Sequence, residues 1–324
     1  GAAGMLGTQY AYGLSQAGAN VVLADIDLKK CQSTEKEIKT KFHTDPMSLK
    51  LDLTKPKSIS SMTSSVIKKF SKIDVLVNNA AYQGNPKIRS QGFENLKLND
   101  WNQAIDVNLT GVFLCCQNIG KKMLKQKSGN IINIASTYGL VGPDQRIYGR
   151  SGQNSAAFYA ATKKSNELLA YSYSHLYGIR TTGLRYFTVY GPWYRPDMAM
   201  SIFAKKISQN KKIDVYNNGK MKRDFTFIDD IIEGTYSAII SNYKCEVFNL
   251  GNNKSEELMV VIGLIEKHLN MNAKINFQPI QPGDVLETYA DINYSKEKLN
   301  FQPKTNIDVG IEKFINWFKD YYYV

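Results

Sequence analysis

The chain opens on Gly1-Ala-Ala-Gly4-Met-Leu-Gly7 and reaches Val21-Val-Leu-Ala24-Asp25 after a predicted helix over residues 8–16. Closely spaced glycines permit a tight turn and let a pyrophosphate approach the N-terminus of the helix. The apolar run predicts a buried strand, and Asp25 at its end can accept hydrogen bonds from an adenosine ribose. This order of turn, helix, strand and acid predicts a dinucleotide site that includes Gly1, Gly4, Gly7 and Asp25.

Asp25 also bears on which dinucleotide would bind. Its carboxylate would repel a 2′-phosphate, which favours NAD over NADP. The alternative is a glycine-rich turn in another kind of α/β unit, but the ordered helix, strand and acid argue against it. In a doubly wound fold a central strand precedes this turn. That first strand is missing from the sequence, so we expect the natural protein to begin several apolar residues before Gly1.

Strands and helices alternate through the rest of the first half. Strands are predicted over residues 47–51, 73–77 and 130–134, and a helix over residues 101–114. Such alternation predicts parallel βαβ units with right-handed crossovers, and therefore an α/β fold with a doubly wound parallel (Rossmann) sheet. Ligands bind at the carboxyl ends of the strands in such sheets. The polar residues expected at these ends are Asp25, Asp52, Asn78 and Ser136, with Asp52 a candidate contact to the adenine.

Tyr159 and Lys163 are four residues apart, in a segment that predicts a helix. One helical turn separates them, so both side chains project from the same face. A fixed ammonium beside a phenol favours the phenolate, which can take a proton from a sugar or alcohol hydroxyl. Alone the spacing is a weak signal, because an ordinary helix face also produces it.

Together these features resemble the short-chain dehydrogenase/reductase superfamily, and residues 1–157 resemble its compact single-domain members. The resemblance is carried by the glycine-rich start, Asp52, Asn78-Asn79-Ala80, Asn108, Ser136 and Tyr159-x-x-x-Lys163. It implies that Asn78, Ala80 and Lys163 hold the cofactor. It also implies that Ser136, Tyr159 and Lys163 are catalytic and that Asn108 completes a proton relay. Ser136 and Tyr159 are further apart than in most compact members, so Thr137 is the substitute for Ser136 and a candidate substrate contact.

The second half is similar to a different branch of the same superfamily. Residues 158–324 resemble UDP-glucuronate 4-epimerases through Thr181-Thr-Gly-Leu-Arg-Tyr-Phe-Thr-Val-Tyr-Gly-Pro-Trp193 and Arg223-Asp-Phe-Thr-Phe-Ile-Asp-Asp230, among other segments. This implies an NAD-binding domain over 1–187, to which segments near 225–250 return, and a smaller nucleotide-sugar domain over 188–324.

Four residues of the second half are candidate substrate contacts. Thr188 follows a predicted strand and can line the sugar site, and Arg195 can clamp a sugar carboxylate with two hydrogen bonds. Arg223 is placed to meet a diphosphate, and Asp284 can accept hydrogen bonds from the uridine ribose. The resemblance implies the same roles, and a surface charge is the alternative for Arg223.

The function favoured by these residues is an NAD-dependent nucleotide-sugar epimerase similar to UDP-glucuronate 4-epimerases. Tyr159, aided by Ser136, would remove the proton of the C4 hydroxyl while hydride passes to NAD, and the 4-keto sugar would take hydride back on its other face. One alternative is a short-chain dehydrogenase/reductase that consumes NAD(H) on a sugar-type alcohol. Another is an inactive fusion of the two types, because the resemblance changes near Tyr159.

Composition excludes several other classes. The chain has no apolar run long enough to cross a membrane and no visible signal peptide. Its four cysteines lack metal or disulfide spacing, so we expect free thiols in the cytoplasm and no metal site. The net charge of +12 comes mostly from dispersed lysines, which are typical of solvated helix faces and argue against nucleic acid. A functional alternative is that they attract an anionic substrate, and the resemblance implies a UDP-sugar as that substrate. A homodimer would be ordinary for the superfamily.

Overall fold

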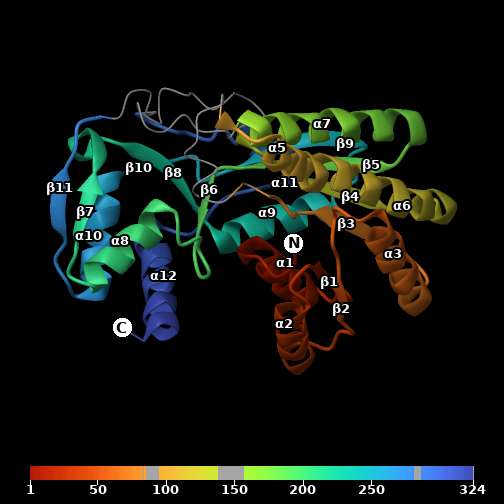
Figure 1. Ribbon diagram of the computed structural model, residues 1–324, viewed down its shortest axis with the longest axis horizontal. Helices are drawn as coiled ribbons and strands as arrows, with labels where there is room; N and C mark the ends of the chain where they lie inside the picture. The colour runs from red at the N-terminus through yellow and green to blue at the C-terminus, as the bar shows by residue number, and fades with distance from the viewer. Residues whose placement is uncertain (83, 85–94, 138–156, 281–285, 324) are drawn as a thin grey trace. The chain divides into compact units, whose positions relative to one another are not determined.

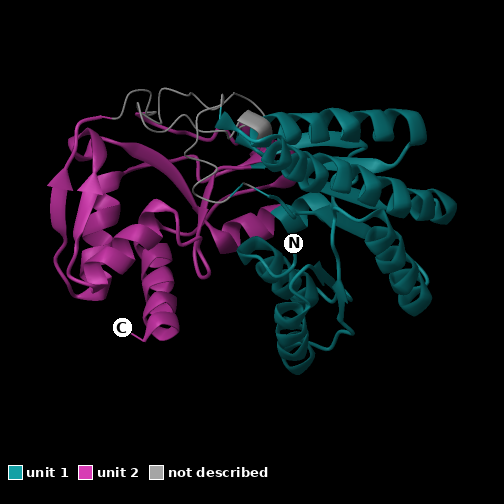
Figure 2. Ribbon diagram, viewed as in Figure 1, with its two compact units in different colours: residues 1–143, 151–185, 235–248 teal, residues 144–150, 186–234, 249–324 magenta. Residues whose placement is uncertain are grey.

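The computed structural model describes residues 1–82, 84, 95–137, 157–280 and 286–323 (Figure 1). Contacts divide the chain into two compact units, coloured separately in Figure 2. Unit 1 comprises the described parts of residues 1–143, 151–185 and 235–248, and unit 2 comprises those of residues 186–234 and 249–324. The predicted α/β fold class is confirmed, because parallel strands alternate with helices.

The first half of unit 1 alternates strands and helices. Its elements are α1 (Met5–Gln16), β1 (Val22–Asp25), α2 (Leu28–Lys41), β2 (Met47–Lys50), α3 (Pro56–Phe70), β3 (Val75–Asn78), α5 (Leu98–Ile105), the π-helical turn η2 (Asp106–Thr110) and α6 (Gly111–Gln126). The chain then forms β4 (Asn130–Ser136), α7 (Ala157–Tyr177) and β5 (Arg180–Tyr186). The end of α9 (Ile228–Ile240) and most of β9 (Cys245–Leu250) also belong to unit 1.

The described strands of unit 1 form two separate sheets. β1 and β2 pair in parallel, with Val22 opposite Met47. The second sheet has the order β3-β4-β5-β9, and β3 and β4 are parallel with Val75 opposite Asn130. The carboxyl ends of β3 and β4 therefore lie at one edge, as the sequence predicted.

Two apolar cores hold these sheets and their helices together. One combines α3, α6 and β4 through Ile59, Met62, Ile119 and Ile131, among others, and the second packs α1 and α2 on β1. Helix α3 begins with Pro56, which favours the first helical turn because its missing N–H has no intrahelical partner there. Helix α1 is followed by Gly18 at φ +88°, a left-handed conformation that suits glycine.

Unit 2 contains two small sheets of its own. Its elements are β6 (Thr188–Tyr190), α8 (Ala199–Ser208), β7 (Lys212–Val215), the 3-10 turn η5 (Tyr216–Gly219), β8 (Lys222–Phe227), β10 (Ser255–Glu257), α10 (Leu258–Leu269), β11 (Lys274–Phe277), α11 (Asn293–Leu299) and α12 (Ile307–Tyr322). The described strands pair in the orders β10-β8-β6 and β11-β7. The core of α12 is formed by Ile311, Phe314, Ile315 and Phe318 at helical spacing.

Candidate active site

The glycine-rich turn lies at the N-terminus of α1. A Cβ atom added at Gly7 would overlap the carbonyl oxygen of Gly1 and lie 2.7 Å from Cα of Ala2. A Cβ added at Gly1 would lie 2.7 Å from the backbone nitrogen of Ala80, just after β3. Only glycine fits such close approaches. The turn thus leaves the N-terminal amides of α1 available to a phosphate, with Gly4 immediately before the helix.

Asp25 ends β1, next to this turn. Its carboxylate accepts hydrogen bonds of 3.0 Å from the backbone N–H groups of Ala3 and Asp27, and the Gly1 ammonium lies 3.4 Å away. Burial alone would raise the pKa of Asp25, but the nearby ammonium and the two amides outweigh it and hold the pKa below its usual range. The carboxylate is therefore charged at neutral pH, as a ribose-binding acid should be.

Asp52 follows β2. Its Oδ1 accepts hydrogen bonds from the backbone N–H of Thr54 at 3.0 Å and from the Thr54 hydroxyl at 2.7 Å. The hydroxyl, followed by the backbone amide and Lys55, lowers the pKa of Asp52 despite some desolvation. These bonds fix one carboxylate oxygen, and contact with an adenine stays a prediction.

The ends of β3 and β4 are joined through amide side chains. Asn78 donates from Nδ2 to Oδ1 of Asn133 at 2.8 Å and contacts Sγ of Cys116 at 3.3 Å. Asn79 donates to the carbonyl oxygen of Gly1 at 3.0 Å. Asn78 thus ties β3 to β4, whereas Asn79 ties β3 to the glycine-rich turn. Asn78 and Asn79 therefore hold together the strand ends and the turn of the predicted cofactor site. A direct contact of Asn78 or Ala80 with the cofactor stays a prediction.

Asn108 lies in the π-helical turn η2 and is 1% exposed. Its Oδ1 accepts from the backbone N–H of Tyr82 at 2.6 Å, and its Nδ2 donates to the carbonyl oxygen of Tyr82 at 2.7 Å. The carbonyl oxygen of Asn108 accepts from Nδ2 of Asn166 at 2.9 Å. In this arrangement the side chain of Asn108 holds the segment after β3, and its main chain is tied to α7.

The predicted single helix over 101–114 is divided by this turn. α5 ends at Ile105 and α6 begins at Gly111, with η2 between them. Inserted π turns occur often at functional sites, where they redirect a backbone group.

The sequence did not single out two residues of this region, Tyr82 and Asn166. The spacing of Asn166, three residues after Lys163 and so near it on the helix surface, was the available signal.

Tyr159 and Lys163 project from α7 beside β4, and Figure 1 shows the two elements together. Lys163 is 3% exposed, and its Nζ donates to the carbonyl oxygen of Ile134 at 2.6 Å. The same Nζ lies 5.5 Å from the centroid of the Tyr159 ring. Burial of the ammonium against one carbonyl leaves two of its donors for other partners. The pair therefore combines a fixed positive charge with a half-buried phenol.

Ser136 is the last residue of β4 and Thr137 follows it. Both are half-buried, two and three residues beyond the carbonyl that anchors Lys163. Unit 1 thus brings α7, the end of β4 and Asn108 into one connected region. This arrangement can hold a hydroxyl-bearing substrate near a base, although catalytic roles for these residues stay predictions.

Three of the four substrate contacts predicted for unit 2 lie among its described residues, namely Thr188, Arg195 and Arg223. Thr188 begins β6, and Arg223 lies in β8. Arg195 forms a forked ion pair with Asp197, with nitrogen–oxygen distances of 3.1 and 2.6 Å. Arg223 donates to the carbonyl oxygens of Lys222 at 2.8 Å and Leu286 at 3.4 Å. Asp284 lies outside the described residues.

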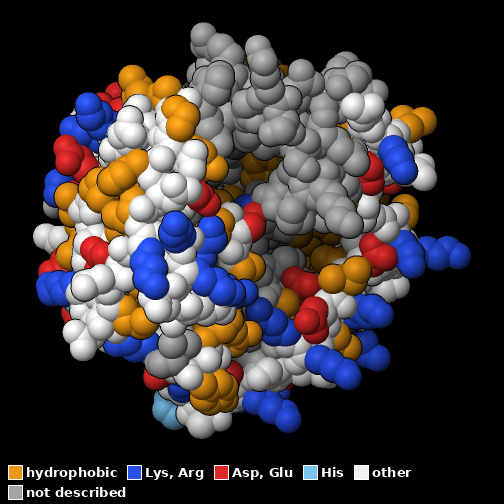
Figure 3. Space-filling model, turned by 60° about the vertical axis from the view of Figure 1, so that its left-hand side comes forward, with side chains coloured by type: hydrophobic (Ala, Val, Ile, Leu, Met, Phe, Trp, Pro, Cys, Tyr) orange, Lys and Arg blue, Asp and Glu red, His pale blue; other side chains and the backbone are white. Residues whose placement is uncertain are grey.

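The described ranges contain no cluster of three or more His, Cys, Asp or Glu residues that could hold a metal ion. Burial raises the pKa of Cys115 to about 11 and that of Cys116 to about 12, so both thiols are protonated at neutral pH. Lysine and arginine side chains are scattered over the face in Figure 3 rather than gathered in one patch. Within the same ranges, no helix combines the length and apolarity needed to cross a bilayer.

Comparisons with known proteins agree with this architecture. The model of the short chain dehydrogenase family matches residues 1–206. An uncharacterized protein of Methanocaldococcus jannaschii is 54% identical over 162 residues, which are 50% of each chain. UDP-glucuronate 4-epimerase 1 of Arabidopsis thaliana is 40% identical over 184 residues, 52% of this chain and 43% of the plant protein. The chain thus spans about half the length of these curated relatives.

A solved structure resembles nearly the whole chain. UDP-glucuronic acid 4-epimerase from Bacillus cereus, in complex with UDP-glucuronic acid and NAD, is 25% identical with a TM-score of 0.75. The match covers 99% of this chain and 98% of the other. Both resemblances expected from the sequence are therefore confirmed. Because the family model matches well over half of its residues, the chain belongs to the short chain dehydrogenase family.

Proposed function

We propose that the protein is an NAD-dependent nucleotide-sugar 4-epimerase that acts on UDP-glucuronate or a close relative. The observation that carries the proposal is the anchored pair on α7, in which buried Lys163 bonds the Ile134 carbonyl beside Tyr159. A base at this place can remove a hydroxyl proton. The likeness to the Bacillus cereus and Arabidopsis enzymes supports the choice of reaction and sugar.

The residues around the turn fit a dinucleotide. Gly1 and Gly7 leave no room for a Cβ, so the backbone can approach a pyrophosphate at the start of α1. Asp25 supplies a charged acceptor for ribose hydroxyls, and its carboxylate would disfavour a 2′-phosphate. When bound, NAD would accept hydride from C4 of the sugar and return it, so that the net reaction is an isomerisation.

The chain's own groups would manage the proton. Tyr159, beside the Lys163 ammonium, takes the C4 hydroxyl proton and returns it to the 4-keto sugar as hydride comes back. Ser136 or Thr137 donates a hydrogen bond to the C4 oxygen. Lys163 also holds the nicotinamide ribose with a donor not used by Ile134.

Substrate contacts in unit 2 complete the proposal. The Arg195 guanidinium already makes a forked bond to the carboxylate of Asp197, and the same fork suits the carboxylate of a glucuronate. Arg223 would bind the diphosphate, Thr188 the sugar and Asp284 the uridine ribose.

We also propose that the enzyme works in the reducing cytoplasm, in keeping with the buried free thiols of Cys31, Cys115 and Cys116. A homodimer is also proposed, on the superfamily resemblance alone.

The test is direct. Purified protein is incubated with NAD and UDP-glucuronate, and the nucleotide sugars are separated by chromatography. Formation of UDP-galacturonate with no net change in reduced-cofactor absorbance supports the proposal. Steady accumulation or loss of reduced cofactor with a sugar-type alcohol would instead identify a dehydrogenase, to which the match over residues 1–206 also points. No turnover of either kind would contradict both.

A further inference from the structure

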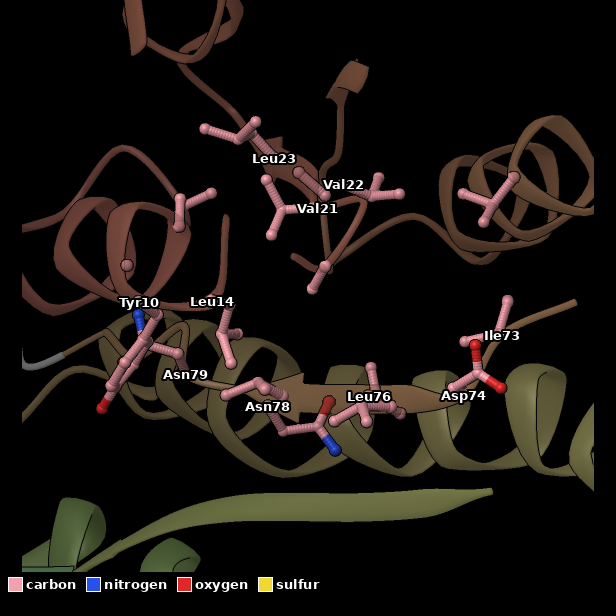
Figure 4. A pocket seen from close by; sticks show the side chains of 18 of the residues that line it. Tyr10, Leu14, Val21, Val22, Leu23, Ile73, Asp74, Leu76, Asn78 and Asn79 are labelled. Carbon is pink, nitrogen blue, oxygen red and sulfur yellow. The ribbon is translucent and has the colours of Figure 1, made fainter. Parts of the chain in front are cut away.

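A cavity of about 680 Å³ in unit 1 borders the predicted cofactor site, because Gly1 and Gly7 help to line it. Figure 4 shows the side chains of Val21–Leu23 on one side of the opening and that of Leu76 on the other. Its position beside the glycine-rich turn gives this cavity no role beyond the one already proposed. A different feature lies in unit 2, around Asp224 of β8.

Asp224 is 0% exposed, and its side chain joins β8 to two distant segments. One oxygen, Oδ1, accepts from the backbone N–H of Asn252 at 2.8 Å and from the Thr226 hydroxyl at 3.2 Å. The other, Oδ2, accepts from the backbone N–H of Ala290 at 3.0 Å. Burial raises the pKa of Asp224, although these three donors partly oppose the shift. Because a buried carboxyl is costly unless its oxygens are bonded, the segments at 252 and 290 are held close to β8.

Thr288 ties residues 286–290 to the same strand. Its Oγ1 accepts from the backbone N–H of Asp224 at 3.0 Å. Its own backbone N–H donates to the carbonyl oxygen of Lys222 at 3.3 Å, and the N–H of Lys222 donates to the carbonyl oxygen of Leu286 at 2.8 Å. Together with the bond from Ala290 to Asp224, these contacts bind the segment to β8 along its length.

Arg223 stands between Lys222 and Asp224 in the sequence, and its side chain rests on the bound segment. Its Nη1 donates to the carbonyl oxygens of Lys222 at 2.8 Å and Leu286 at 3.4 Å. Both carbonyls belong to the main chain that the contacts of Thr288 and Lys222 hold in place. A guanidinium is planar and rigid, so two bonds to one of its nitrogens restrict the direction of its other donors.

We propose that Asp224 and Thr288 are positioning residues, which hold Arg223 in the orientation needed to bind the diphosphate of a nucleotide sugar. The role rests on the proposed function, in which Arg223 binds that diphosphate. Neither side chain has to touch the substrate, because each acts through the main chain that carries or supports the guanidinium. A tie with a structural role alone would instead change stability without a particular effect on a diphosphate.

The first experiment compares Thr288→Val with Thr288→Ser in the full chain. Valine removes the oxygen that accepts from Asp224, whereas serine retains it. Calorimetric titration measures the affinities for UDP and for UMP, which lacks the second phosphate. We expect Thr288→Val to weaken UDP binding about tenfold, equivalent to ~1.4 kcal/mol, with a much smaller change for UMP. Thr288→Ser should bind UDP like the unaltered chain, and Asp224→Asn should resemble Thr288→Val.

The second measurement needs no substrate. Side-chain NMR of protein labelled with ¹⁵N-arginine reports the order of the Arg223 guanidinium, whose Nε–H signal is identified by its loss in Arg223→Lys. We expect the order parameter of this group to fall in Thr288→Val and to be kept in Thr288→Ser. Ser295→Ala is the matched control, because it removes another buried hydroxyl bond of unit 2, to the carbonyl oxygen of Asn249 at 2.6 Å. It should change neither the Arg223 signal nor the UDP affinity.

Three outcomes would overturn the inference. They are an unchanged Arg223 order parameter in Thr288→Val, equal losses of UDP and UMP affinity, and unchanged UDP affinity in a variant whose Arg223 has become mobile. If Asp224→Asn does not fold, Thr288→Val, which keeps the carboxyl group, decides among them. Failure of the proposed function is distinct, because the unaltered chain would then bind no UDP, and the role in substrate binding would fall with it.

Discussion

The Nζ atom of Lys163 donates a 2.6 Å hydrogen bond to the carbonyl oxygen of Ile134, so a helix side chain is fixed to the end of a β-strand. Lys163→Met should abolish turnover and lower the free energy of unfolding by about 1–3 kcal/mol, because the buried carbonyl loses its partner. Lys164→Met is the matched control, since that neighbouring lysine is half exposed and its Nζ lies 3.3 Å from the carboxylate of Glu167. Urea denaturation and epimerase assays check both variants. Equal stability losses at the two positions would contradict the role of this bond.

Tyr159→Phe should reduce kcat by about 10²- to 10⁴-fold with little change in stability, because it removes only the hydroxyl of the proposed base. Tyr171→Phe on the same helix provides the control, as that ring is 62% exposed. Turnover and NAD binding are measured for both variants. Full activity of Tyr159→Phe would assign the base to another residue, whereas loss of NAD binding would make its role structural.

Asn108→Ala separates a structural role from a proton relay. The side chain makes two hydrogen bonds to the backbone of Tyr82, so its removal should lower the free energy of unfolding by about 2 kcal/mol. Asn118→Ala is a control that removes one bond to a helix carbonyl on α6. A relay acting without this anchor would instead reduce kcat, and alter its pH profile, at unchanged stability. Chemical denaturation combined with pH–rate profiles distinguishes the two results.

Gly7→Ala should weaken NAD binding and destabilise the protein by about 1–3 kcal/mol, because the added methyl overlaps the Gly1 carbonyl oxygen. Gly263→Ala in α10 has open space around its Cβ and should raise stability by up to ~1 kcal/mol. Calorimetric titration with NAD and thermal unfolding measure the two effects. Unchanged NAD affinity in Gly7→Ala would remove the turn from the cofactor site.

The chain starting at Gly1 should become more stable as pH rises toward 8. Burial lowers the pKa of its amino group, although the nearby Asp25 carboxylate partly opposes the shift. Between this lowered value and the unfolded pKa near ~8, the unfolded chain binds more protons, so its stability increases with pH by at most ~1.4 kcal/mol per unit. Denaturation between pH 6 and 9 measures the slope. The N-acetylated chain is the control, and an identical slope there would refute the assignment.

Much of the fold was predictable because its signals are local. Apolar runs located β1 and β4 to within two residues, and the glycine-rich turn located α1. The π-helical turn was not predictable, since the main-chain oxygen of Asn108 bonds to Asn166, 58 residues further along the chain. Its side-chain partner, Tyr82, carries no motif of its own. Periodicity reports which face of a helix is buried, but it does not report a bond between distant segments.

The anchors of α7 are main-chain atoms, the carbonyl oxygens of Ile134 and Asn108. A carbonyl is present whichever residue occupies the position, so substitutions at these two sites leave the acceptors in place. The position of Tyr159 is therefore tolerant of sequence drift in the elements that support it. Descendants of this chain could exchange the side chain of Ile134 and still keep the geometry of the proposed base, provided that Lys163 and Asn166 are retained.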